Sequence, residues 1–346
     1  MIETELGVAR PSVYFEEQFK SLPKLENKTV AITGTTSGTG YVAAETFGRL
    51  GARVILLNRP SARADKTLHV LQSIGLPGSF YQVDCDLQSF ESVRSSLPKI
   101  EALCEQGLDV LCNNAGVMAL EDTATVDGFD IQMQTNHLSH FLLTKLVFPF
   151  LEKAESLRGE ARIVNHSSMA RLMVKRLESK YMEKRGGDLG GNGSLMLLFP
   201  GGRWIRYGQS KLANAAFTSC LHEKLKIRKS NIKAVVAHPG VADTDLQRTT
   251  VKDVGGRSWL NRSFLDMVFR VYIKMGQSKE DGALGIIKSM ADPVVRSGEF
   301  IGPGMTMAAM KGPALSYPLE GYYDNVETRE LLWTKSCEAI EDDFVI

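Results

Sequence analysis

The sequence predicts an α/β fold built on a doubly wound parallel sheet. Short apolar runs alternate along the chain with segments long enough for helices, which is the pattern of parallel strands linked by helical crossovers. A glycine-rich turn follows the first run, and in this class of fold such a turn joins a strand to the next helix. With 346 residues, 43% of them hydrophobic, the chain is long enough for one large core.

Six apolar runs are the expected strands. They are nearly continuous in apolar residues, as strands are when helices cover both faces of a parallel sheet. The segments between them, among them 41–50, 90–105 and 129–157, are expected to be the crossover helices. In chain order the runs read TVAITG, RVILLN, FYQVDC, LDVLCN, ARIVNH and IKAVVAH.

We expect residues 28–346 to form a single domain, preceded by a surface extension over 1–27. The alternation breaks at 169–206, where a basic stretch is followed by GGDLGGNGSLMLLFPGG. So many glycines disfavour a regular element, and the apolar LMLLF favours an inserted loop that covers an apolar site. Near the end, NVETRELLWTKSCEAIEDDF begins with Asn and an acidic first turn, which predicts a surface helix.

Composition excludes several classes of function. Forty-one Lys and Arg balance 40 Asp and Glu, so no broad field attracts nucleic acid. The five cysteines are scattered and form no CxxC pair, which argues against a disulfide framework or structural zinc and favours a reducing, cytoplasmic location. The acidic N-terminus resembles neither a secretory signal nor a transit peptide.

No apolar stretch is long enough to cross a bilayer. Residues 250–275 form a second segment expected on the substrate side, and its apolar part, FLDMVFRVYIKM, has basic residues on one helical face. We favour a packed or substrate-covering helix there, and peripheral membrane contact is the alternative left open.

The turn after the first strand is the expected cofactor site. TVAITGTTSGTGYVAAETF runs from a predicted strand through Gly34, Gly38 and Gly40 into a predicted helix that begins near Thr39. Glycines let the backbone approach a pyrophosphate, and the helix N-terminus offers free amides and a positive dipole end. A tight strand-to-helix turn alone would need the same glycines, but the strand before and the helix after favour a dinucleotide.

The end of the second strand predicts which dinucleotide binds. Asn58 stands where an acidic residue would bond the ribose hydroxyls of NAD, and Arg59 follows it. A carboxylate would repel a 2′-phosphate, whereas an arginine binds it through charge-assisted bonds. We therefore expect NADP(H); the alternative is a solvent-exposed arginine at the start of a loop.

Two tyrosines compete for the proton-transfer role. Tyr207 has Lys211 four residues later, on the same helical face, where the ammonium can stabilise a phenolate. Tyr181 has Arg185 at that position and two glycines at once after it, which leave little room for a helix. The sequence after Tyr207 continues as an amphipathic helix, so we choose Tyr207.

These motifs resemble the short-chain dehydrogenase/reductase superfamily. Thr33 and the Gly-x3-Gly-x-Gly spacing are similar to its TGxxxGxG motif, CNNAGVM to its NNAG motif, and AHPGVADTDL to its PG motif. MQTNHLSHFLLT is similar to NHLGHFLLT of the retinol-dehydrogenase-like branch. The match spans roughly residues 28 to 245 and implies a Rossmann-like sheet of about seven strands in the order 3-2-1-4-5-6-7.

The resemblance also implies roles for single residues. Tyr207 would be the general acid or base, Lys211 would lower its pKa and orient the ribose, Ser168 would polarise the carbonyl, and Asn136 would distort its helix and complete a water relay. His137 and His140 lack an acidic or cysteine partner, so we expect no metal. The implied cofactor-binding set is Gly34, Thr36, Ser37, Gly38, Gly40, Arg59, Asp86, Leu87, Asn113, Ala115, Gly116, Tyr207, Lys211, Pro239, Gly240 and Thr244.

The expected function is NADP(H)-dependent interconversion of a carbonyl and an alcohol on an apolar small molecule. The departures from the family pattern, which include 169–206, 250–275 and His166 in place of a small residue, surround the expected substrate cleft and leave the substrate open. A non-catalytic NADP-binding scaffold or redox sensor, and a reductase of a conjugated C=C bond, are the alternatives. The chain is expected to be a monomer or a homodimer.

Overall fold

The computed structural model describes residues 10–185, 188–193, 201–242, 276–304 and 311–346. Within these residues the strands form one eight-stranded sheet in the order β3-β2-β1-β4-β5-β6-β7-β8. Strands β1 to β7 pair in parallel and β8 pairs antiparallel to β7. The strands are β1 Thr29–Thr33, β2 Arg53–Asn58, β3 Ser79–Asp84, β4 Val110–Asn113, β5 Ala161–His166, β6 Ile232–Ala237, β7 Glu299–Gly302 and β8 Leu315–Pro318.

The predicted doubly wound sheet is confirmed, with β8 as an additional edge strand. The chain order reverses between β1 and β4, which are neighbours in the sheet. In open α/β sheets the ligand binds beyond the carboxyl ends of the strands at such a reversal. A ligand is therefore expected at the loops that follow β1 and β4.

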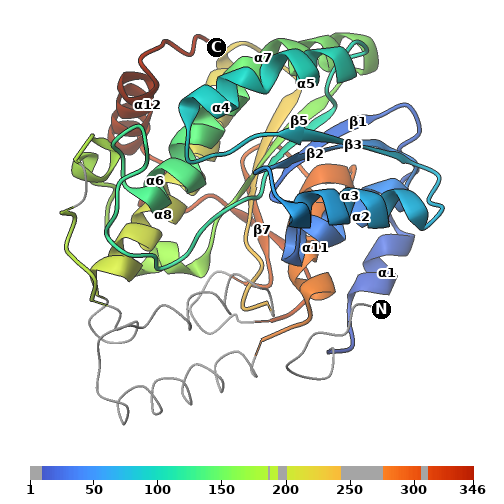
Figure 1. Ribbon diagram of the computed structural model, residues 1–346, viewed down its shortest axis with the longest axis horizontal. Coiled ribbons are helices and arrows are strands. Elements are labelled where there is room, and N and C mark those ends of the chain that lie inside the picture. The colour runs from blue at the N-terminus through green and yellow to red at the C-terminus, as the bar shows by residue number, and fades with distance from the viewer. Residues whose placement is uncertain (1–9, 186–187, 194–200, 243–275, 305–310) are drawn as a thin grey trace.

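Helices cover both faces of the sheet (Figure 1). Alternate residues of β1 face opposite sides, with Ala31 in one apolar core and Val30 and Ile32 in the other. All of β1 is buried, as expected for a central parallel strand. One layer contains α2 Gly38–Arg49, α3 Ala62–Ser73 and α11 Lys279–Ala291; the other contains α4 Phe90–Ser95, α5 Leu97–Leu103, α7 Ser139–Arg158 and α8 Gly202–Ile227.

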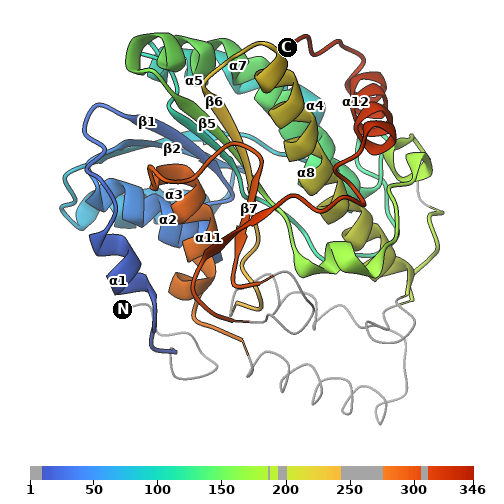
Figure 2. The same ribbon diagram turned by 180° about the vertical axis from the view of Figure 1, so that it is seen from behind.

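The predicted final helix is also present. Helix α12, Val326–Ile340, begins after Asn325, whose side chain accepts a hydrogen bond from the Thr328 amide. It packs against α8 (Figure 2), and its tryptophan, Trp333, stacks on Phe344.

Three expected elements differ in detail. Strand β3 lies at the sheet edge, so only Phe80 and Val83 of its six residues are buried. The 90–105 crossover is two helices, because Pro98 opens α5 in its first turn. The 129–157 crossover consists of α6 Ile131–Met133, the π-helical turn η1 Gln134–Leu138 and α7.

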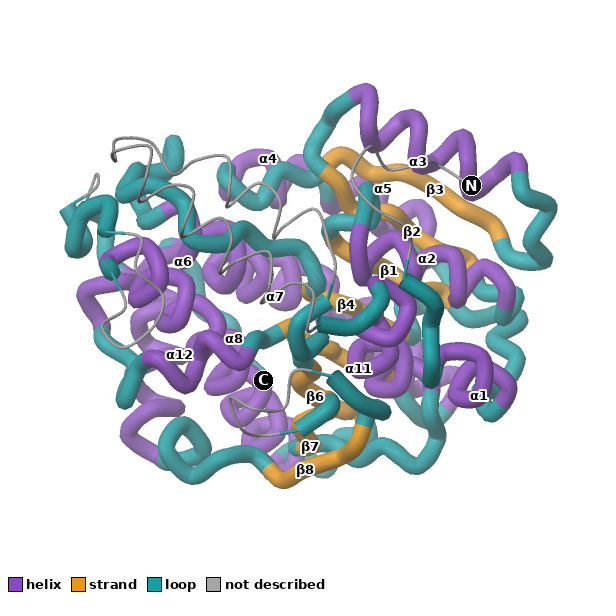
Figure 3. Tube along the Cα trace, turned by 90° about the horizontal axis from the view of Figure 1, so that it is seen from below, coloured by secondary structure: helices purple, strands orange, loops and turns teal. Residues whose placement is uncertain are grey.

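The described part of the N-terminal extension is anchored to the domain. One oxygen of Asp281 in α11 accepts the amides of Tyr14 and Phe15 at 2.9 and 3.1 Å, and the other accepts the amide of Val13 at 2.8 Å. Helix α1, Phe15–Lys20, lies beside α11 as a result (Figure 3). Asp281 is itself buried.

None of the helices over the described residues combines the length and the apolar character that a bilayer span requires. The segment 250–275, for which membrane contact is the open alternative, lies outside the described residues.

Candidate active site

The glycine-rich loop after β1 packs closely against the end of β4. Gly34 has a positive φ of 70°, and a Cβ there would lie 2.8 Å from the Cβ of Ala115. At Gly40 a Cβ would lie 2.2 Å from the carbonyl oxygen of Gly34. Side chains at either position would force this loop open, so the glycines are needed for the close turn.

The loop leads into the N-terminus of α2. Ser37 is the N-cap residue, and its side chain makes no capping bond. The first amides of a helix have no partner within the helix, so an uncapped N-terminus of this length can bind a phosphate. Thr36, Ser37 and Gly38 all lie at this end. The local structure fits the diphosphate of a dinucleotide.

Asn58, at the end of β2, holds the glycine loop. Its Oδ1 accepts the Thr35 amide at 2.8 Å, and its Nδ2 donates to the Thr35 hydroxyl at 2.8 Å. Arg59 follows at the exposed edge, and no described acidic residue forms an ion pair with it. The arginine is thus available to an anion near the loop.

The residues that follow β3 and the residue that ends β4 are fixed by internal bonds. Asp86 Oδ1 accepts the Gln88 amide, and the Leu87 carbonyl accepts the Ser139 hydroxyl. Asn113 is buried, and its amide nitrogen donates to Thr144 Oγ1 and Asn165 Oδ1. Asn113 therefore joins β4 to its neighbours.

Asn114, which the sequence reasoning did not select, ties the two loops together. Its Nδ2 donates to the Thr33 carbonyl at 2.8 Å, and its Oδ1 accepts the Thr39 hydroxyl at 3.0 Å. The dipeptide Asn113-Asn114 signals a strand-ending turn, but only the fold shows that its second member bridges to the glycine loop.

Asn136 lies in the π-helical turn η1. Its Oδ1 accepts the Val117 amide at 2.7 Å, and its Nδ2 donates to the Val117 carbonyl and to Ser210 Oγ, both at 2.9 Å. The loop after β4 is thereby linked to α8. A π-helical turn within a helix is a frequent mark of a functional site, and the expected helix distortion at this asparagine is present.

Tyr207 and Lys211 lie one turn apart on α8, and both are buried. The Lys211 ammonium donates to the His166 carbonyl at 2.9 Å and lies 5.9 Å from the centre of the Tyr207 ring. Burial lowers the pKa of Lys211 to about 7. A Cβ at Gly116 would lie 3.1 Å from Asn136 Oδ1 and 3.2 Å from Lys211 Nζ. Asn136 and Lys211 therefore meet at Gly116.

Ser168 follows β5 and begins the 3-10 turn η2, Met169–Met173. Its hydroxyl oxygen accepts the Ala170 amide at 3.2 Å. Ala170 belongs to the same small apolar cluster as Tyr207, together with Met118, Ala119 and Trp204. The structure thus brings the serine turn against the tyrosine that the sequence selects.

Tyr181 lies in a different environment. It belongs to the turn η3, Ser179–Met182, and is buried in the large apolar core rather than in the cluster around Tyr207. Burial raises the pKa of its phenol. The Lys180 ammonium lies 5.0 Å from its ring centre. The turn ends at Met182, so no helix continues from Tyr181 to place a later lysine on its face.

The remaining candidates lie on the β6 side. Gly240 has a positive φ of 62°, and the Pro239 carbonyl accepts the Gln277 side-chain amide at 2.8 Å. Thr244 lies outside the described residues.

His140 Nε2 lies 2.9 Å from Thr33 Oγ1, and over the described ranges no three or more His, Cys, Asp or Glu residues gather into a metal site.

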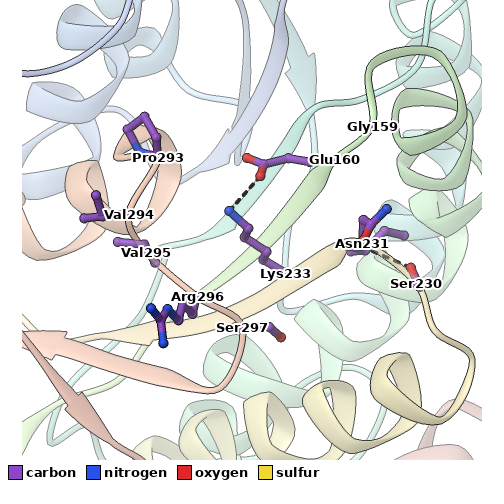
Figure 4. A pocket seen from close by; sticks show the side chains of 11 residues that line it. Gly159, Glu160, Ser230, Asn231, Lys233, Pro293, Val294, Val295, Arg296 and Ser297 are labelled. Carbon is purple, nitrogen blue, oxygen red and sulfur yellow. Dashed lines mark hydrogen bonds and ion pairs between the residues drawn. The ribbon is translucent and has the colours of Figure 1, made fainter.

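A hollow of about 650 Å³ lies at the opposite end of the sheet (Figure 4). Its lining includes Gly159, just before β5, and Asn231, just before β6, with an ion pair between Glu160 and Lys233 at 2.6 Å. Tyr207 and Ser168 lie beyond the carboxyl ends of the strands. The hollow is therefore separate from the candidate active site.

Known proteins match this chain in sequence. A family model described as short chain dehydrogenase matches residues 28–183. An uncharacterized oxidoreductase of Schizosaccharomyces pombe is 36% identical over 232 residues, which is 66% of this chain and 65% of that protein. Retinol dehydrogenase 14 of Mus musculus is 37% identical over 65% of this chain and 64% of its own length. The chain thus spans just under two thirds of these relatives.

Three further matches cover more of the chain. The human polyprenol dehydrogenase is 28% identical over 91% of this chain and 86% of its own length. The crystal structure of an uncharacterized protein from Mycobacterium paratuberculosis covers 95% of this chain and 98% of its own, with a TM-score of 0.68 and 27% identity. The L-sorbose reductase of Gluconobacter frateurii, solved with NADPH and L-sorbose, shares the fold at 20% identity and a TM-score of 0.60, covering 82% of this chain and 98% of its own.

Proposed function

The chain belongs to the short-chain dehydrogenase family, in its retinol-dehydrogenase-like branch, and on this premise we propose that it is an NADP(H)-dependent oxidoreductase. It interconverts a carbonyl and an alcohol on an apolar small molecule. The observation that carries the proposal is the convergence of Asn136 and Lys211 at Gly116, with Tyr207 one turn from the lysine. A scaffold that only binds nucleotide has no chemical need for this arrangement.

The cofactor would be held by the loops that follow β1 and β4, where the chain order of the strands reverses. The uncapped N-terminus of α2 would bind its diphosphate, and Arg59 would bind the 2′-phosphate that distinguishes NADP from NAD. When bound, the nicotinamide supplies or accepts the hydride. Asn58 does not contribute a negative charge here, because its side chain is neutral and engaged with Thr35.

Tyr207 would transfer the proton at the substrate oxygen. A phenol has an ordinary pKa of about 10, so it needs a nearby positive charge to act near neutral pH. Lys211 lies on the same face of α8 and is held by the His166 carbonyl. At pH values below its pKa of about 7, the ammonium would stabilise the phenolate directly.

Ser168 and Asn136 would complete the proton path. The Ser168 hydroxyl, at the carboxyl end of β5, would donate to the substrate oxygen and polarise the carbonyl. The side-chain amide of Asn136 donates to Val117 and to Ser210. The backbone carbonyl of Asn136 lies in the irregular π turn. That carbonyl lies 2.9 Å from His140 Nδ1, and we place the water relay toward Lys211 beside it.

The substrate class rests on two supports. The cluster around Tyr207 consists of Met118, Ala119, Ala170 and Trp204, with Met173 packed against it, so the surroundings of the tyrosine are apolar. Two relatives are named for apolar alcohols, retinol and polyprenol. For this chain we propose a terpenoid, retinoid, steroid or lipid carbonyl.

The organisation of the chain completes the proposal. Residues 28–346 would be a single domain, with 169–206 as a cover placed before the tyrosine, although α8 already begins at Gly202. The chain would act in the cytoplasm as a monomer or homodimer, with peripheral membrane contact through 250–275 as the alternative. Size-exclusion chromatography with light scattering and flotation with liposomes would test these two points.

The central test is NADPH consumption against a panel of apolar and polar carbonyl compounds, with product analysis. We expect the apolar compounds to be reduced to alcohols. Faster turnover of polar aldehydes would contradict the substrate class, and reduction of a conjugated C=C bond would replace the reaction type. NADPH binding without consumption across the panel would favour the scaffold.

A further inference from the structure

We propose that Arg171, held by Glu320, is a positioning residue that fixes Ser168 for the reaction. This inference rests on the proposed function, because it concerns how the serine hydroxyl is aimed at the substrate oxygen. It adds a contribution from the C-terminal segment, which lies outside the matched family region of 28–183.

The Arg171 guanidinium is fully buried and held from two sides. Its Nε and Nη2 lie 2.8 and 2.7 Å from Glu320 Oε2. Its Cζ lies 4.2 Å from the centre of the Phe300 ring in β7. Charge-assisted bonds and stacking on an aromatic face together leave a planar guanidinium little freedom to turn.

The third edge of the guanidinium reaches Ser168. Arg171 Nη1 donates to the Ser168 carbonyl at 3.3 Å, and the Arg171 amide donates to the same oxygen at 3.1 Å. The peptide group after Ser168 is therefore fixed by two donors from one residue. Because the serine side chain is attached at the start of this peptide, fixing the peptide restricts the direction of the hydroxyl.

The opposite side of the turn is fixed by α8. A Cβ at Gly208 would lie 2.9 Å from the Ala170 carbonyl oxygen, so turn and helix are in close contact one residue after Tyr207. The distance between Ser168 and Tyr207 thus depends on this contact and on the residues that pack against the opposite side of the turn. The Arg171–Glu320 pair supplies that second restraint.

Glu320 is itself anchored to α8. Its carbonyl accepts the amides of Tyr323 and Asp324, and Asp324 Oδ1 accepts the Ser219 hydroxyl at 2.6 Å. In Figure 2 the C-terminal segment that precedes α12 crosses α8. The serine turn is therefore held between α8 and the C-terminal segment. Because that segment is itself bonded to α8, both restraints position the turn relative to α8.

A buried ion pair contributes little net stability, because the desolvation of both charges offsets their attraction. An apolar pair of similar volume would fill the same space. The planar geometry of the guanidinium, which joins Ser168, Glu320 and Phe300, is what an apolar pair would lack. We therefore assign the pair to orientation.

The test is the neutral double variant Arg171→Met with Glu320→Gln. Removing both charges avoids an unpaired buried charge, so the variant should fold. We expect kcat to fall by about tenfold to a hundredfold, as a small misplacement of a reacting group does. The Kd for NADPH, measured by fluorescence, should stay within about twofold of wild type.

The matched control is Arg162→Met with Glu160→Gln. This pair also joins a buried arginine to a glutamate, with Arg162 Nε and Nη2 at 2.8 and 2.6 Å from Glu160 Oε1. It lies at the amino end of β5, whereas Ser168 follows the carboxyl end. Its loss should leave kcat unchanged.

The same substitutions in a Ser168→Ala background separate positioning from general damage. If Arg171 acts through Ser168, they should lower kcat no further there. An unchanged kcat in the wild-type background, or an equal loss in both backgrounds, would overturn the inference. Should no carbonyl in the panel be reduced, the proposed function fails, and hydrogen exchange decides instead. Faster exchange at 169–173 in the double variant supports the restraint, and unchanged exchange refutes it.

Discussion

The ammonium nitrogen of Lys211 lies 2.9 Å from the carbonyl oxygen of His166 and donates a hydrogen bond to it. This bond joins the helix that carries Tyr207 to the end of the strand that precedes Ser168. The side-chain Nδ2 of Asn214 donates to the same carbonyl at 3.0 Å. The proposed acid-base residue and the proposed polarising residue are therefore placed relative to each other by a backbone oxygen.

Replacement of Tyr207 by Phe should lower kcat by about a hundredfold to ten-thousandfold, which is the usual contribution of general acid-base catalysis. NADPH consumption measures the loss, and NADPH binding should be retained because only a hydroxyl is removed. Tyr181→Phe is the matched control, since that tyrosine is equally buried but packs in the main core. A larger kcat loss in Tyr181→Phe would reverse the choice of tyrosine.

Replacement of Arg59 by Ala should weaken the preference for NADPH over NADH by about tenfold to a hundredfold. A charge-assisted bond to a phosphate contributes roughly 1.5 to 3 kcal/mol, and about 1.4 kcal/mol corresponds to a factor of ten. The ratio of the two Kd values measures the preference. If Arg59→Ala leaves this ratio unchanged, another residue reads the 2′-phosphate.

Replacement of Gly116 by Ala should reduce kcat, because the new methyl group would lie 3.1 Å from Asn136 Oδ1 and 3.2 Å from Lys211 Nζ. Both groups would have to shift by a fraction of an ångström, and we expect a loss of about tenfold or more. Gly321→Ala is the control, since nothing lies within 4 Å of a Cβ there. Equal kcat values for the two variants would show that this contact does not matter.

Four buried histidines should make the protein unfold in acid. Burial lowers the pKa of His137, His166 and His238 to about 3 and that of His140 to about 4. Below about pH 6.5 the unfolded chain binds protons that the folded chain does not, so the unfolding free energy falls as the pH falls. At pH 5 each histidine lowers the unfolding free energy by about 2 kcal/mol. The four losses together approach the unfolding free energy of an ordinary domain. Circular dichroism measured against pH should therefore show unfolding at about pH 5.

A single substitution tests this account. His137→Gln removes one of the four groups, so the slope of the unfolding free energy between pH 6 and 5 should fall by about a quarter. The exposed His69→Gln is the control and should keep the wild-type slope. An unchanged slope in His137→Gln would mean that the acid sensitivity lies in other groups.

The strands of the sheet could be predicted because apolar runs such as ARIVNH are buried on both faces, which leaves a strong signal. The edge position of β3 followed only from the resemblance, because the neighbours of a strand are set by long-range pairing and not by the strand's own residues. The π turn at Asn136 was also hidden, since its flanking residues keep the apolar spacing of an ordinary helix. Only the resemblance indicated a distortion there.

The site could be predicted wherever its residues lie close in sequence, as Tyr207 and Lys211 do. The pair Arg171 and Glu320 is separated by 149 positions, and neither residue stands in a recognisable motif. Asn114 illustrates a different limit, because two adjacent asparagines look alike until the strand shows which one faces the glycine loop. Thr244 and 250–275 stay predictions.

The bonds that join Asp281 to the amides of Val13, Tyr14 and Phe15 have a consequence for the order of events during synthesis. The amides leave the ribosome long before their carboxylate, which is 268 positions from Val13. Contacts so distant in sequence form slowly, because a long loop must close first. We expect the N-terminal segment to remain unattached until α11 has been synthesised. Its attachment to α11 should be among the last steps of folding.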